Sequence, residues 1–130
     1  MGLTDDVRAL LEAPSTCYLA TTMPDGSPQL SQVWVDTDGT DVIVNTVAGF
    51  QKVRNIERDP RVSLTVSAPS NPSSYTEIRG TVREVTEEGG AEHIDRLSQK
   101  YLGRPYPWFG GRDQTRLIVR ISPTRIRSMG

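Results

Sequence analysis

Two strand-like segments joined by a Pro-Asp-Gly turn leave the fewest choices for the fold of this chain. Residues 16–36 read TCYLATTMPDGSPQLSQVWVD, with β-branched and aromatic side chains on both sides of Pro24, Asp25 and Gly26. Proline fixes one backbone angle of a reversal, and glycine accepts the positive angle that completes it. The segment is therefore predicted to form a β-hairpin, around which a sheet must be built.

Four later segments extend the predicted sheet. Residues 61–68 alternate Val62, Leu64 and Val66 with polar side chains, the period-two signature of a half-buried strand. Gly80 interrupts a longer strand-like run, which predicts either a β-bulge or a close approach of another backbone. The other strands expected after the hairpin cover residues 41–46, 75–85 and 115–129.

Three segments carry apolar side chains at helical spacing, and they cover residues 3–14, 50–59 and 87–101. The middle segment has an apolar face and an opposite polar face, with Phe50, Val53 and Ile56 against Gln51, Arg54, Asn55 and Arg58. Six mostly antiparallel strands and three helices predict a mainly β fold, a small β-barrel with packed helices.

Length and charge narrow the range of functions. A chain of 130 residues is predicted to form a single domain, residues 1–130. Its 15 basic and 16 acidic residues leave a net charge of -1, so the chain has no positive electrostatic field that would attract nucleic acid or an anionic membrane. The acidic N-terminus and the lack of a long apolar run predict a cytoplasmic protein without a membrane segment.

Residue types that carry chemistry by themselves are scarce. The single cysteine, Cys17, and the single histidine, His93, predict neither a disulfide nor a zinc site. Cys17 is expected in the core because it lies inside a strand, and His93 on the surface because its neighbours are charged. With no Ser/His/Asp arrangement and no phosphate-binding glycine loop, an enzyme built on this chain would need a cofactor for its reactivity.

Lys52 stands in the first turn of the predicted middle helix, where a cation is disfavoured. If Gly49 caps this helix, the helix dipole places positive potential at Lys52, where an acidic side chain would be expected. Asn45, Thr46, the free N–H groups and the Lys52 ammonium could together hold a phosphate. The alternative left open by these residues is that Lys52 is simply solvated.

Five segments of the chain carry a resemblance to a known family. They read LATTMPDGSPQLSQVWVD, VNTVAGFQKVRNIERDPRVSL, YTEIRGTVREV, YLGRPYPW and RLIVRISPTRIRSMG. In this order they resemble the split β-barrel flavin and deazaflavin oxidoreductases, a superfamily that includes pyridoxine 5'-phosphate oxidase. Within it, the sequence is most similar to the branch that uses the deazaflavin coenzyme F-420. The resemblance implies a six-stranded antiparallel split β-barrel and a homodimer with coenzyme sites between its subunits.

The resemblance also implies which residues contact the coenzyme. Those along the tricyclic ring are Pro28, Gln29, Ser31 and Val33. Those at the phosphate are Asn45, Thr46 and Lys52, with Arg54 and Asn55 close by. Two residues of the other subunit, Ser74 and Tyr75, would close over the coenzyme, and no metal site is implied.

One position departs from the flavin-using relatives. These usually carry an arginine one or two positions before the lysine, where this chain has Phe50 and Gln51. The terminal phosphate of FMN carries nearly two charges and would lack that guanidinium, whereas the phosphodiester of F-420 carries only one. The departure favours F-420 over FMN and leaves Lys52 to act with helix N–H groups and Arg54.

The implied activity is transfer of a hydride from reduced F-420 to a conjugated C=C or C=N bond of a small, flat substrate. No residue is marked as catalytic, and Tyr75, Tyr106 or water could supply the accompanying proton. Two alternatives stay open: an FMN-binding oxidase or flavin reductase of the same fold, and a non-catalytic protein that binds F-420.

The aromatic residues allow two interpretations. In the first, Trp34, Tyr106, Trp108 and Phe109 form the wall of a substrate pocket. In the second, Trp34 packs at the dimer interface and residues 105–109 form a surface loop held by prolines.

Overall fold

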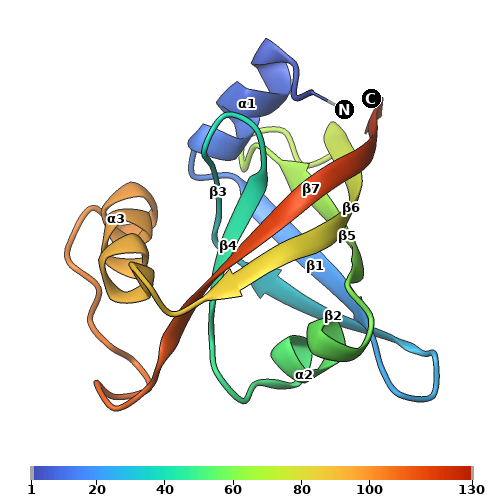
Figure 1. The fold of residues 1–130 in the computed structure, drawn as a ribbon. Coiled ribbons are helices and arrows are strands. Elements are labelled where there is room, and N and C mark those ends of the chain that lie inside the picture. The colour runs from blue at the N-terminus through green and yellow to red at the C-terminus, as the bar shows by residue number, and fades with distance from the viewer. Residues whose placement is uncertain (1, 130) are drawn as a thin grey trace.

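The computed structural model describes residues 2–129, which form one curled antiparallel sheet with three helices around it (Figure 1). The strands are β1 (Thr16–Thr22), β2 (Pro28–Val33), β3 (Val35–Thr37), β4 (Val42–Val47), β5 (Arg61–Ser67), β6 (Tyr75–Thr86) and β7 (Arg116–Met129). The helices are α1 (Asp5–Glu12), α2 (Gln51–Arg58) and α3 (Gly90–Leu102). The mainly β class is confirmed.

The sheet has seven strands rather than the six expected from the sequence, because the second arm of the hairpin divides at Trp34. The strand order is β2-β1-β5-β6-β7-β4-β3, and neighbouring strands pair antiparallel. β2 pairs with β1 at one edge of the sheet, whereas β3 pairs with β4 at the other. Since only Trp34 separates β2 from β3, the two edges are held together and the sheet must curl into a half-barrel.

The core fills the inside of this half-barrel and is closed at one end by α1, while α2 lies at the opposite end and α3 to one side (Figure 1). Leu11 of α1 is fully buried, as are Leu19, Val119 and Ile121 of the strands. Cys17 belongs to the same cluster, as predicted, and burial raises the pKa of its thiol to about 12. None of the helices in residues 2–129 is both long and apolar enough to cross a lipid bilayer.

Gly80 lies at a register shift between β6 and β7. A Cβ atom at this position would come within 2.6 Å of both the Ile121 side chain and the Ser122 carbonyl oxygen. Both predicted features, the bulge and the close backbone approach, are therefore present, and they allow the two longest strands to bend around the core.

The middle helix, α2, differs from the sequence expectation in three places. Its N-cap is Phe50 rather than Gly49, which precedes the cap with a positive φ of 90°. Phe50 is 44% exposed instead of sharing the buried face of Val53 and Ile56. Asn55, assigned to the polar face, is fully buried because its amide donates hydrogen bonds to Thr21 Oγ1 and Met23 Sδ on the hairpin.

Candidate functional site

A cavity of about 220 Å³ lies between the start of α2, strand β4, the start of β7 and the loop after α3. It is lined by Gln32, Val33, Trp34, Asn45, Thr46, Phe50, Lys52, Ile94, Tyr106, Phe109 and Arg116. The three residues expected at a phosphate, Asn45, Thr46 and Lys52, are thus brought together by the fold.

Lys52 and Arg116 place two half-buried cations on this cavity. Burial lowers the pKa of each from its ordinary value, and the charge of Arg116 lowers the pKa of Lys52 further. Among residues 2–129, neither cation forms an ion pair with a carboxylate. Neighbouring cations that repel each other and lack a counter-charge form a site suited to an anion.

The other lysine of the chain shows how a half-buried ammonium is satisfied without a ligand. Lys100 Nζ donates hydrogen bonds to the carbonyl oxygens of Leu11, at 3.0 Å, and Val35, at 2.5 Å. Within residues 2–129 the Lys52 ammonium has no such hydrogen bond, although it is similarly buried. Water or a ligand must therefore supply the hydrogen bonds that Leu11 and Val35 give to Lys100.

Arg116, at the start of β7, is a site residue that the sequence patterns did not single out. Its Nε donates a hydrogen bond to Asn45 Oδ1 at 2.8 Å, and its guanidinium lies 5.3 Å from the centre of the Tyr106 ring. Nη1 also lies 3.5 Å from the Tyr106 hydroxyl, while Nη2 has no partner among residues 2–129. These contacts hold the guanidinium at the cavity and leave N–H donors available for a ligand.

Two hydroxyl groups at sequence-predicted positions are buried without a hydrogen-bond partner in the described part of the chain. They are Thr46 Oγ1 and Ser31 Oγ. Thr46 is 3% exposed and lines the cavity beside the two cations. A buried hydroxyl left without a partner costs about 1–3 kcal/mol, so a ligand oxygen at Thr46 would remove a penalty.

The sequence expectation for His93 is also wrong, because its side chain is buried and not on the surface. Its exposure is 2%, and its two ring nitrogens lie 3.1 Å from Asp36 Oδ2 and 3.1 Å from Asn45 Nδ2. The burial follows from the close docking of α3 at Gly90, where a Cβ would come within 2.1 Å of the Arg116 carbonyl oxygen. Neighbouring charges in the sequence did not reveal this packing.

The ring-contact residues predicted on β2 divide between two sides of the strand. Gln29, Ser31 and Val33 alternate with the exposed Pro28, Leu30 and Gln32. Of the four predicted residues, Val33 alone lines the cavity, where it also belongs to the core. Gln29 Oε1 instead accepts a hydrogen bond from Thr21 Oγ1 at 2.8 Å.

The remaining predicted residues lie away from the cavity. The Asn55 amide is engaged inside the chain, as described above, and Arg54 donates to Gly49 O and Gln51 Oε1 on the exposed side of α2. Ser74 and Tyr75 lie at the start of β6, outside the cavity lining. Their contact with the coenzyme from the other subunit, which the family resemblance implies, stays a prediction.

The aromatic residues form one packed cluster. Trp34 stacks on Tyr101 with ring centres 5.2 Å apart, and Tyr106 meets Trp34, Trp108 and Phe109 edge to face. Trp34, Tyr106 and Phe109 line the cavity, whereas Trp108 supports Tyr106 from outside the lining. Trp108 also has a positive φ of 54°, which is unusual for a bulky residue and marks this loop as held by its packing.

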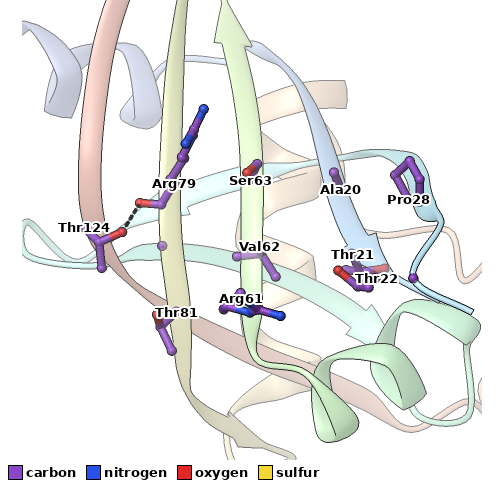
Figure 2. A pocket seen from close by; sticks show the side chains of 12 residues that line it. Ala20, Thr21, Thr22, Pro28, Arg61, Val62, Ser63, Arg79, Thr81 and Thr124 are labelled. Atoms are coloured by element: carbon purple, nitrogen blue, oxygen red, sulfur yellow. Dashed lines mark hydrogen bonds between the residues drawn. The ribbon is translucent and has the colours of Figure 1, made fainter. Parts of the chain in front are cut away.

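A larger cavity, about 600 Å³, lies elsewhere, on the outer side of β1, β5 and β6 (Figure 2). Its two cations already have partners: Arg61 Nη2 lies 2.7 Å from Asp59 Oδ2, and Arg79 Nε lies 3.6 Å from Glu77 Oε2. This cavity therefore lacks the unmatched charge of the smaller one. In the described residues, no group of three or more metal-ligating side chains is present.

Comparisons with known proteins agree with this architecture. An F-420 reductase of known structure is 30% identical, with a TM-score of 0.83 over 96% of this chain and 98% of that one. A conserved hypothetical protein from Mycobacterium tuberculosis is also 30% identical, with a TM-score of 0.75 over 97% of this chain and 84% of the other. A putative pyridoxamine 5'-phosphate oxidase from Listeria innocua, 23% identical with a TM-score of 0.72 over 96% of both chains, shares the fold.

The family model described as pyridoxamine 5'-phosphate oxidase matches residues 3–130, nearly the whole chain. The superfamily that the sequence motifs suggested is thus found again by an independent comparison and by the fold. The chain belongs to the pyridoxamine 5'-phosphate oxidase family.

Proposed function

We propose that this protein is an F-420-dependent oxidoreductase that holds the phosphodiester of the coenzyme between Lys52 and Arg116. The observation that carries the proposal is the pair of half-buried cations without a carboxylate partner in the described residues. The Thr46 hydroxyl, which has no hydrogen-bond partner within residues 2–129, and the start of α2 add hydrogen-bond donors and positive potential at the same place. All of these groups favour an anion with hydrogen-bond-accepting oxygens.

The choice of F-420 over FMN has its own support. Two cations fit either phosphate by charge alone, so the preference comes from Phe50 and Gln51, which occupy the positions where flavin-using relatives usually have an arginine. The F-420 reductase, 30% identical over 96% of the chain, supports the same choice. We propose that Arg116, and not Arg54, binds the phosphodiester together with Lys52, because Arg54 lies outside the cavity.

The size of the cavity indicates which part of the coenzyme it receives. Pockets that enclose a whole ligand of this kind measure about 300–1,000 Å³, whereas this one measures about 220 Å³. It therefore suits the phosphodiester and its neighbouring atoms. The tricyclic ring would lie outside, against the exposed side of the barrel, where a second subunit is needed to cover it.

We propose a homodimer formed through the outer face of β2, β1, β5 and β6. Exposed apolar side chains gather on this face, with Leu30 at 66%, Tyr18 at 42% and Tyr75 at 39% exposure. Tyr18 and Leu30 flank a common hollow, and Tyr18 shares another with Tyr75. Burying this face would bring Ser74 and Tyr75 of one subunit toward the partner, as the family resemblance implies.

F-420 supplies the hydride in this proposal, and the chain supplies binding and surroundings. Lys52 and Arg116 bind the anionic part and fix its position. Trp34 and Tyr106 would shield one side of the coenzyme's anionic part from water, with the more exposed Phe109 packed against Tyr106. The Tyr106 hydroxyl, beside Arg116, is a candidate proton donor, as are Tyr75 of a second subunit and water.

The test is a titration of the purified protein with F-420 and, separately, with FMN, followed by the fluorescence of each coenzyme. We expect saturable binding of F-420 that is tighter than that of FMN and that weakens in Arg116→Ala. Arg8→Ala, which removes a cation already paired with Asp5 on α1, far from the cavity and from the proposed dimer face, is the matched control and should bind as wild type does. Preferential binding of FMN, or equal loss in both variants, would overturn the proposal.

Catalysis is tested with the reduced coenzyme bound. We expect its reoxidation by at least one member of a panel of enones, imines and quinones, measured by the absorbance of oxidised F-420. Binding without reoxidation by any of them would instead support a coenzyme-binding protein without catalytic activity.

A further inference from the structure

We propose that His93 is a positioning residue for the anion site, which fixes the Arg116 guanidinium through Asn45. The inference rests on the proposed function, because it gives a role in coenzyme binding to a residue that touches neither the cavity nor the coenzyme. Its basis is a hydrogen-bonded chain from Asp36 to Arg116, buried at His93 and Asn45 and partly buried at its ends, that joins β3, α3, β4 and β7.

The direction of each hydrogen bond in this chain is determined by its neighbours. Asn45 Nδ2 donates to Gly90 O at 2.9 Å and lies 3.1 Å from His93 Nδ1. Because an amide nitrogen carries only donors, His93 Nδ1 must accept, and the ring hydrogen must be on Nε2. Nε2 then donates to Asp36 Oδ2 at 3.1 Å.

This arrangement allows Asn45 only one orientation. With both Nδ2 hydrogens used, Oδ1 faces Arg116 and accepts from Nε at 2.8 Å. A flipped amide would place its NH2 group against the Arg116 N–H and its oxygen against the Gly90 carbonyl, so two favourable contacts would become repulsive. His93 and Gly90 therefore keep the oxygen of Asn45 directed at Arg116.

Arg116 needs this support because of the charge beside it. Lys52 repels the guanidinium, and without an anchor the long arginine side chain would turn toward solvent. The hydrogen bond from Arg116 Nε to Asn45 leaves the two terminal nitrogens of the guanidinium free of Asn45. The Tyr106 ring supports the guanidinium, whose carbon lies 5.3 Å from the ring centre. A guanidinium held in place before binding loses less conformational freedom when the anion arrives.

The experiment is a double-mutant cycle between His93 and Arg116, read as affinity for F-420. His93→Leu removes the acceptor for Asn45 while keeping an apolar side chain in the same space. We expect it to weaken binding about three- to tenfold, the effect of losing one supporting hydrogen bond. In the Arg116→Ala background the same substitution should change affinity less than about twofold, since the residue that it positions is gone.

Rescue and stability measurements separate positioning from a general structural role. His93→Gln offers an amide oxygen to Asn45 and should recover part of the lost affinity. His93→Leu should lower the thermal unfolding midpoint in both backgrounds, whereas it should lower F-420 affinity only where Arg116 is present. An equal loss of affinity in both backgrounds would overturn the inference.

The wild-type protein gives a test that needs no variant to fold. Nitrogen-15 spectra of the single histidine should report hydrogen on Nε2 and none on Nδ1, and the opposite tautomer would overturn the inference. If Arg116→Ala itself leaves F-420 affinity unchanged, the proposed anion site fails. If Arg116→Ala weakens binding but His93→Leu does not, only the positioning role fails.

Discussion

Replacing Lys52 by methionine should weaken coenzyme binding and at the same time stabilise the empty protein. The ammonium is half-buried beside Arg116 and has no carboxylate partner among residues 2–129, so its charge disfavours the folded state. Removing it while keeping an apolar stem should raise the free energy of unfolding by about 0.5–1 kcal/mol, the scale of one partly exposed charge interaction. Affinity for F-420 should fall about ten- to hundredfold, from loss of a charge-assisted hydrogen bond worth about 1.5–3 kcal/mol.

The pH dependence of this stabilisation shows whether the charge of Lys52 causes it. Because the pKa of Lys52 lies below its ordinary value of 10.5 in the folded chain, folding disfavours the charged form. The penalty is complete below the folded pKa and disappears above the unfolded pKa. The stability advantage of Lys52→Met over wild type should therefore be largest near neutral pH and shrink as pH rises toward 10.5.

Urea unfolding without coenzyme at neutral and alkaline pH measures the change in stability, and F-420 fluorescence measures the change in coenzyme affinity. Arg54→Met is the control, since Arg54 lies on the exposed side of the same helix, and it should leave affinity unchanged. A Lys52→Met protein that is less stable than wild type, or that binds F-420 equally well, would refute the reasoning.

Three further outcomes are expected. Leu30→Glu, at the most exposed apolar position of the proposed dimer face, should convert a dimer into a monomer in sedimentation experiments. A variant that stays dimeric would show that the interface lies on another face. Gly90→Ala should destabilise the fold by about 1–3 kcal/mol in urea unfolding, because its Cβ would meet the Arg116 carbonyl oxygen; wild-type stability would contradict this packing. Cys17, whose thiol pKa burial raises to about 12, should stay unreactive toward Ellman's reagent at pH 8 until the protein unfolds, and rapid labelling of the folded protein would contradict its burial.

Local patterns in the sequence were sufficient for the elements and for part of the site. Strand alternation, turn residues and helical spacing predicted the hairpin and the three helices, since each depends on residues close together in the chain. The glycine at position 80 was enough to indicate the bulge, although the strand that it meets, β7, is distant in the sequence. Asn45, Thr46 and Lys52 could be grouped for the same reason, because the end of one strand and the start of the next helix are adjacent in sequence.

Long-range packing decided what the sequence could not. The division at Trp34, which gives the seventh strand and curls the sheet, depends on β3 pairing with β4 at the opposite edge. Arg116 reaches the cavity because β7 lies beside β4, and its hydrogen bond to Asn45 joins residues 71 positions apart. His93 is buried because α3 docks at Gly90. A single sequence without the strand order carries no local signal for these contacts, so only the tertiary structure could place the second cation and its support.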